Sequence, residues 1–173
     1  MTTTTEIEVY RYHLQPGYIF STVEPSLVTA IVGTCVAVCL HDRRLKTGGI
    51  NHFLYPKAGW LNKTTPQFGD VAIPALIRMM LSQGSRIEDL EAQIIGGASK
   101  SWNDLSSDIG KKNVKIARKI LKSKGIPIVS EDVGGLKGRR IVFHTMTNET
   151  IIMKTNKLRR GDFYPYRERI TAN

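Results

Sequence analysis

The sequence predicts an α/β or α+β protein in which a mixed β-sheet is flanked by at least two helices. Strand-like and helix-like segments alternate along the 173 residues, as they do where helices pack against a sheet. Apolar residues make up 41% and charged residues 23% of the chain, the ordinary mixture of a globular protein. We expect one domain over residues 1–173, with loosely docked ends at 1–16 and 156–173.

The first predicted strand occupies residues 27–40, LVTAIVGTCVAVCL, where β-branched and small apolar residues dominate. Gly33 predicts a break or bulge within it. Residues 48–55, GGINHFLY, predict a second strand after a turn. We therefore expect the two segments to be neighbours in a sheet.

Two amphipathic helices are predicted in the middle of the chain. Residues 70–83 predict the first, with Asp70 as its N-cap and Gly84 as its stop. Residues 109–124 predict the second, with Asp108 as its N-cap. Each segment places apolar residues along one face, so both helices should pack inward.

Further strands are expected around these helices. Residues 92–97, AQIIGG, predict a short buried strand whose two glycines indicate that another backbone approaches closely. After the second helix, three apolar or alternating segments predict strands: IPIVSED, RRIVFHTMT and ETIIMKT. The last two are expected to form a hairpin around residues 147–149.

The chain carries a formal charge of +10, and residues 111–124, KKNVKIARKILKSK, contain only basic charges. A basic face can bind nucleic acid, but no zinc-ligand set, RNP-type aromatic cluster or helix-turn-helix pattern accompanies it. A solvated helix face, or a docking surface for an acidic protein, explains the charge as well. We expect no nucleic acid partner.

Cysteine usage and hydropathy favour a cytoplasmic location. No window approaches the roughly 18 apolar residues that a membrane span requires, and the N-terminus MTTTTEIEVY lacks the pattern of a signal peptide. Cys35 and Cys39 lie too far apart along a strand to form a disulfide. Free thiols are typical of a reducing compartment, and we expect no membrane insertion.

Cys35 and His52 are the residues best suited to catalysis. A cysteine attacks as its thiolate, and a nearby imidazole can take the thiol proton. Gly33 would let the backbone bend, so that amide groups around Thr34 face the site and hold an oxyanion. Thr29 would share the strand face of Cys35 if the strand were unbroken, where its hydroxyl could orient the histidine or the substrate.

The residue types alone leave structural explanations open. A cysteine in an apolar strand is commonly inert, and Cys39 fits that description. Histidines on apolar strands, such as His52 and His144, are commonly structural, whereas His13 and His41 are expected at the surface. No cysteine pair has C-x-x-C spacing, so we expect no metal site.

Several separated blocks resemble the CheD family of chemoreceptor glutamine deamidases. The resemblance runs from about Gly17 to Lys154 and is carried, in the family's order, by FSTVEPSLVTAIVGTCVAVCLHD, GGINHFLYP, FGDVAIPALI, IIGGA, DIGKKNV and VSEDVGGLKGRRIVFHT. Thr34 stands where the family usually has a serine before its cysteine, and it keeps the hydroxyl. The ordered set of blocks is far more specific than any one of them.

The resemblance implies a cysteine hydrolase with a three-layer fold that converts receptor glutamines to glutamate, releases ammonia and needs no cofactor. It implies that Cys35 is the nucleophile, His52 the general base and acid, and Thr29 the third polar member of the site. Backbone amides near Gly33 and Thr34 would support the oxyanion.

The resemblance also implies partners for the chain. These are the chemoreceptors that serve as substrates and a CheC-like phosphatase. An alternative function is that of a non-catalytic adaptor, which would dock on either partner through the basic helix. Four exposed cations of this helix are the expected contacts: Lys111, Lys112, Lys115 and Arg118.

Overall fold

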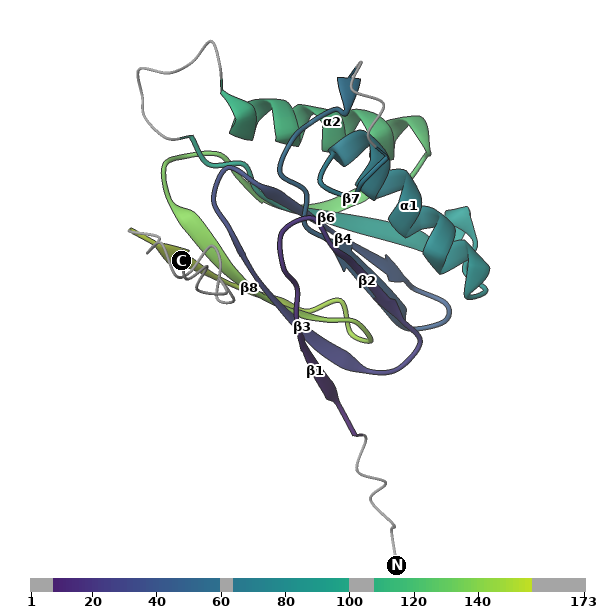
Figure 1. The fold of residues 1–173 in the computed structure, drawn as a ribbon. Coiled ribbons are helices and arrows are strands. Elements are labelled where there is room, and N and C mark those ends of the chain that lie inside the picture. Colours follow the sequence, from purple (N-terminus) through teal and green to yellow (C-terminus); the bar gives the residue numbers. More distant parts are fainter. Residues whose placement is uncertain (1–7, 60–63, 100–107, 157–173) are drawn as a thin grey trace, which may run out of the picture.

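The computed structural model describes residues 8–59, 64–99 and 108–156. These residues form three layers, in which a four-stranded sheet packs on a five-stranded sheet and two helices cover the far side of the latter (Figure 1). The helices are α1 (Gly69–Ser82) and α2 (Ile109–Ser123), and a short 3-10 turn, η2 (Ile87–Asp89), follows α1. The α+β class is confirmed, with two mixed sheets in place of the single expected sheet.

The four-stranded sheet has the order β1 (Tyr10–His13), β3 (Ser26–Val32), β8 (Gly138–His144) and β9 (Thr150–Thr155). β1 runs parallel to β3, and the other pairs are antiparallel. The hairpin of β8 and β9 confirms the one predicted around residues 147–149. Residues 10–13, within the N-terminal segment expected to dock loosely, pair with β3 as the edge strand β1. The expected tail at 156–173 lies outside the described residues from 157 onward.

The five-stranded sheet is the middle layer. Its order is β2 (Ile19–Thr22), β5 (Thr47–Asn51), β4 (Val36–Asp42), β6 (Leu90–Gly96) and β7 (Ile128–Val133). β6 and β7 are parallel, and the remaining pairs are antiparallel. β4 and β5 are buried along their whole length because both faces of this sheet are covered, which accounts for the uninterrupted apolar sequence of β4.

The segment predicted as one strand over residues 27–40 is two strands in different sheets. β3 ends at Val32, residues 33–35 form a bend, and β4 begins at Val36. The break predicted at Gly33 is confirmed, but it carries the chain from one layer to the next. Alternation of side chains is therefore not continuous across the bend, and the unbroken strand on which Thr29 and Cys35 would share a face does not form.

Two glycines at the end of β6 allow this bend to pass close by. Gly96 and Gly97 have φ values of +115° and +67°, and a Cβ atom at Gly96 would collide with the carbonyl oxygen of Cys35. The amide of Gly97 donates to the Cys35 carbonyl (2.8 Å), and that of Ala98 donates to the Gly33 carbonyl (2.9 Å). The close backbone approach predicted for residues 96–97 is confirmed.

The two helices begin in different ways. Asp108 caps α2 by accepting a hydrogen bond from the amide of Lys111 (3.1 Å), as predicted. The N-cap of α1 is Phe68, one residue before the start of the helix, so the cap expected at Asp70 is wrong. The Asp70 carboxylate instead accepts from the amide of Ala58 (3.1 Å). Among the described residues, neither helix has the length and apolar character needed to cross a bilayer.

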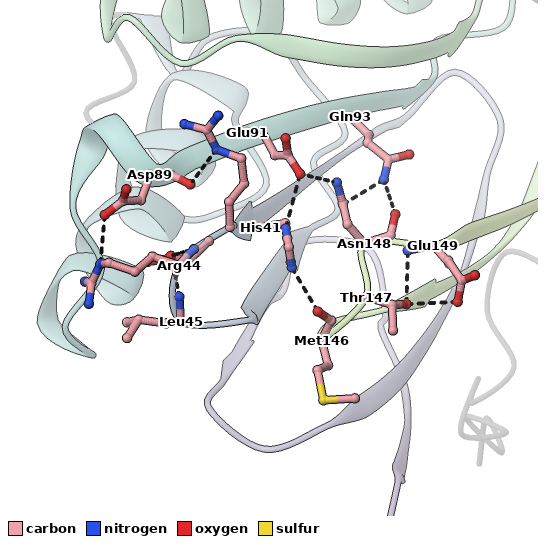
Figure 2. A network of polar contacts seen from close by, with 12 residues as sticks. His41, Arg44, Leu45, Asp89, Glu91, Gln93, Met146, Thr147, Asn148 and Glu149 are labelled. Carbon is pink, nitrogen blue, oxygen red and sulfur yellow. Dashed lines mark hydrogen bonds and ion pairs between the residues drawn. The ribbon is translucent and has the colours of Figure 1, made fainter.

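A polar network ties the turn between β8 and β9 to the middle sheet (Figure 2). The Nδ1 atom of His41 lies 3.2 Å from the Glu91 carboxylate, and its Nε2 atom lies 3.0 Å from the Met146 carbonyl oxygen. Asn148 donates to Glu91 (2.9 Å), and Gln93 donates to the Asn148 backbone and side-chain oxygens (both 2.8 Å). His41 is 3% exposed, so the surface position expected for it is wrong.

Replacing Gly96 with alanine tests the close crossing. Gly96→Ala should lower the free energy of unfolding by roughly 3 kcal/mol or more, since the new methyl group displaces the Cys35 carbonyl in addition to straining the backbone. Gly125→Ala is the matched control, because Gly125 has φ +68° but open space around its Cβ position. It should cost only about 1 kcal/mol. Urea unfolding measures both values, and equal losses would contradict the steric account.

Candidate active site

Cys35 and His52 lie at the same end of the middle sheet. Val36 and Phe53 exchange both of their backbone hydrogen bonds (3.1 and 3.0 Å), and Cys35 and His52 directly precede these two residues. Continuing the register places His52 opposite Ala37, two residues from Cys35. Residues opposite each other share a face of a sheet, so His52 faces the same side of the middle sheet as Ala37.

That side is the apolar layer between the two sheets. Cys35 is partly buried and packs against the cluster that contains Ala37 and Cys39. His52 is 1% exposed, and Cys39 is fully buried, as expected for a core cysteine. Water is thus largely excluded from around the imidazole, while the thiol retains some exposure.

The His52 ring lacks hydrogen-bond partners. Within the described residues, neither ring nitrogen has one, although both are buried. Burial lowers the pKa of His52 to about 4, the Leu14 backbone partly offsets this without forming a hydrogen bond of good geometry, and the charge of His13 adds to it. Buried polar atoms are normally paired. The layer between the sheets therefore holds a neutral imidazole whose two nitrogens are unpaired among the described residues.

Burial has the opposite effect on the cysteine. It raises the pKa of Cys35 to about 11, and the backbone amide of the same residue partly opposes this shift. Burial raises the pKa of Cys39 further. Burial therefore favours the uncharged form of both side chains at neutral pH.

The bend at residues 33–35 is held by its carbonyl groups. The carbonyls of Gly33 and Cys35 accept the two hydrogen bonds from the segment after β6. Within the described residues, the amide N–H groups of Thr34 and Cys35 donate to no other residue. Such free donors beside a nucleophile are the kind of group that can stabilise an oxyanion.

Thr29 points away from the thiol. Its hydroxyl lies 2.9 Å from Nδ1 of His13, and both residues line an open surface pocket on the outer face of the four-stranded sheet. The Thr29 carbonyl accepts from the amide of Leu14 (2.8 Å). Thr29 is thus connected to His52 only through the segment that contains His13 and Leu14.

Asn113 is a site residue that the sequence analysis missed. Its side-chain amide donates to the carbonyls of Thr34 (2.9 Å) and Leu54 (2.8 Å), which lie on the two segments that carry Cys35 and His52. Asn113 is fully buried. The sequence did contain a signal for this role, because a polar asparagine stands on the apolar side of α2, four residues before the buried Ala117.

The predicted basic face lies on the outside of α2. Lys111, Lys112, Lys115 and Arg118 are all exposed. Arg118 forms a two-pronged ion pair with Glu131 (2.8 and 2.9 Å). Among the described residues, no group of three or more His, Cys, Asp or Glu side chains lies close enough together to hold a metal ion.

Comparison with known proteins places the chain in a family. A sequence profile described as CheD chemotactic sensory transduction matches residues 56–154, more than half of the chain. This chain belongs to the CheD family. A protein of Trichlorobacter lovleyi named probable chemoreceptor glutamine deamidase CheD is 36% identical over 145 residues, which cover 83% of this chain and 90% of that protein. The resemblance predicted from the sequence blocks is confirmed.

Two further relatives carry the same name. One, from Sulfurimonas denitrificans, is 33% identical and matches 87% of this chain and 98% of its own length. Another, from Caulobacter vibrioides, is 39% identical over 136 residues, or 77% of this chain and 72% of that protein. The CheD profile includes Asn113 but begins after His52. The profile match therefore extends to neither Cys35 nor His52.

The buried imidazole should make stability depend on pH. The unfolded chain protonates His52 near pH 6.5 and the folded protein only near pH 4, so the unfolded state binds more protons between these values. The contribution of His52 to the free energy of unfolding should therefore fall by about 3 kcal/mol as the pH drops across that window.

His52→Gln isolates this contribution, because glutamine does not titrate. Denaturant unfolding of both proteins at several pH values between about 4 and 6.5 gives the difference in slope. The wild type should lose stability more steeply than the variant. Parallel curves would show that His52 is not buried in its neutral form.

Proposed function

We propose that this CheD-family protein is a cysteine hydrolase that deamidates glutamine side chains of chemoreceptors in chemotaxis. Its relatives are named as probable chemoreceptor glutamine deamidases. The observation that supports this activity for the present chain is that Cys35 and His52 directly precede the paired residues Val36 and Phe53, and that the buried His52 ring has no hydrogen-bond partner among the described residues. We assign the activity to one domain that spans residues 1–173, located in the cytoplasm.

In the first half of the reaction, the Cys35 sulfur attacks the carboxamide carbon of the glutamine while His52 takes the thiol proton. The C=O electron pair moves to the oxygen, and the amides of Thr34 and Cys35 donate to this oxyanion. His52 then gives its proton to the nitrogen, the C–N bond breaks and ammonia leaves. A thioester between Cys35 and the former glutamine remains.

In the second half, water attacks the thioester. His52 removes a proton from the water as its oxygen bonds to the carbonyl carbon, and the C–S bond then breaks. The proton returns to the Cys35 sulfur, and the receptor keeps a glutamate. The net reaction consumes one water and releases one ammonia, so no cofactor is required.

Burial keeps both catalytic side chains uncharged before the substrate binds. The nucleophilicity of a thiolate rises with its pKa, but the thiolate fraction falls faster, so attack requires His52 to take the proton as the sulfur reacts. The low pKa of His52 keeps the imidazole neutral and able to accept the proton. The dry layer between the sheets thus favours a concerted transfer over a resting ion pair.

Thr29 has an indirect role in this proposal. Its carbonyl holds Leu14, and its hydroxyl holds His13, in the segment that lies against His52. Thr29 would therefore fix the wall of the imidazole pocket, and it touches neither the substrate nor the thiol.

The basic residues of α2 are proposed to dock the protein partner. The start of α2 lies beside the Cys35 bend, since Gly110 packs directly on Gly97. Lys111, Lys112 and Lys115 therefore border the site and would attract an acidic surface of a chemoreceptor. A CheC-like phosphatase would use the same face, with Arg118 held in place by Glu131. No nucleic acid is required to explain the charge.

Replacing the nucleophile tests the proposed activity. Purified wild-type protein incubated with receptor cytoplasmic fragments should raise the fragment mass by about one unit per converted glutamine, and Cys35→Ala should abolish the gain because no thioester can form. Cys39→Ala is the matched control. It removes the other thiol from the same core layer and should leave the conversion intact, as mass spectrometry would show.

Conversion by Cys35→Ala at the wild-type rate would overturn the mechanism. A wild-type protein that binds receptor fragments tightly but converts no glutamine would instead identify an adaptor. Both outcomes are read from the same samples, provided that binding is measured alongside the mass.

Charge reversal on α2 tests the docking surface. Lys112→Glu combined with Lys115→Glu should raise KM for receptor fragments by roughly tenfold and leave kcat nearly unchanged, because rim charges act on encounter more than on chemistry. Lys122→Glu combined with Lys124→Glu makes the same change in net charge at the far end of the helix. Steady-state kinetics at two salt concentrations should show a smaller effect for this pair, and equal effects would argue for net charge alone.

A further inference from the structure

We infer that Asn113 is a positioning residue that sets the relative placement of the Cys35 bend and the His52 segment. The inference deepens the proposed function, on which its kinetic readout rests. It starts from the point where β4 separates from the segment that carries His52.

The two paired segments separate immediately beyond the Val36–Phe53 pair, where the bend leads into Val36 and Leu54 follows Phe53. The amides of Leu54 and Tyr55 both donate to the carbonyl of Gln67 (2.8 and 3.0 Å), so this segment no longer pairs with β4. Asn113 reaches in from α2 at this fork. Its Nδ2 atom donates one hydrogen bond to the Thr34 carbonyl and one to the Leu54 carbonyl, so it bridges the two separating segments.

The contact with Thr34 orients the next amide along the chain. The Thr34 carbonyl and the Cys35 N–H belong to the same planar peptide group and point in opposite directions. Holding the carbonyl toward Asn113 therefore aims the Cys35 N–H away from α2. This N–H is one of the two free donors proposed to bind the oxyanion. Asn113 thus acts on the reacting atoms through the peptide plane and without touching the substrate.

The second contact fixes the histidine side of the fork. Leu54 follows His52 by two residues, and its carbonyl shares the same Asn113 nitrogen with the Thr34 carbonyl. One side chain therefore determines the separation of the two segments. α2 gives it a rigid base, because Asp108 caps the helix and Gly110 packs tightly on Gly97.

The burial of Asn113 supports a role beyond packing. The side chain is fully buried, and within the described residues its Oδ1 atom has no hydrogen-bond partner. An unpaired buried acceptor is unfavourable, and an apolar side chain of similar shape would avoid that cost. The two hydrogen bonds donated by Nδ2 are the function that such an apolar residue would lack.

Asn113→Leu tests the inference, with Gln93→Leu as its matched control. Gln93 is also a buried amide whose nitrogen makes two hydrogen bonds, but it pairs with Cys39 and contacts the turn at Asn148, away from the fork. Three quantities are measured for each protein: kcat and KM with receptor fragments, the free energy of unfolding, and the pH profile of Cys35 alkylation by iodoacetamide.

Asn113→Leu should lower kcat by about 100-fold with little change in KM, which is the effect of misplacing reacting groups by roughly 1 Å. It should also shift the pH profile of Cys35 alkylation, because the thiol and the imidazole no longer keep their placement. Gln93→Leu should lose comparable stability but keep both the wild-type kcat and the wild-type profile. Asn113→Ser, which retains a hydrogen-bond donor, should recover part of the lost kcat.

The inference would be overturned if kcat fell in proportion to stability in both variants. It would also be overturned if Asn113→Leu kept the wild-type pH profile of Cys35 alkylation. Should Asn113→Leu fail to fold, the comparison of Asn113→Ser with Asn113→Ala decides the question, and equal kcat values would count against the hydrogen bonds. A wild-type protein without deamidase activity would refute the proposed function alone. The pH profile of Cys35 alkylation would then still test the positioning role of Asn113, since alkylation requires no turnover.

Discussion

The contact between the Cys35 carbonyl and Gly96 is the constraint on which the rest of the structure depends. The chain has only residues 33–35 in which to pass from the four-stranded sheet to the middle sheet, and the carbonyl takes the space that a side chain at Gly96 would fill. The end of β6 is fixed by the same contact, and Gly97 in turn packs on the start of α2. A few backbone atoms therefore fix the relative placement of the Cys35 bend, the central strands and the covering helix.

The same arrangement governs the electrostatics of the site. Because the bend enters the layer between the sheets from one end, Cys35 is only partly buried, while His52 is almost completely buried. Burial favours the uncharged form of each group, raising one pKa and lowering the other. The uncharged state of both groups is thus a consequence of their location between the sheets.

Local patterns in the sequence were sufficient for the elements that depend on local chemistry. The cap at Asp108, the second helix and the close approach at Gly96 were all predicted, since a cap or a glycine acts within a few residues. The passage between sheets at Gly33 was predicted only as a break, because nothing local tells which sheet the next strand joins. The shared face of Thr29 and Cys35 was expected only for an unbroken strand, and the bend between β3 and β4 removes that condition. Asn113 escaped prediction because its two acceptors, Thr34 and Leu54, lie 79 and 59 residues away in sequence.

The network around His41 has a consequence for motion. It lies at the end of β4 opposite to Cys35 and binds the β8–β9 turn to the middle sheet through His41 and Gln93. The two sheets are therefore linked at both ends, by the covalent bend at one and by hydrogen bonds at the other. Sliding of one layer over the other is opposed at each end, so the layers should move as a unit. Under the proposed function, a receptor segment would therefore adapt its own shape to reach Cys35, because the linked layers resist separation.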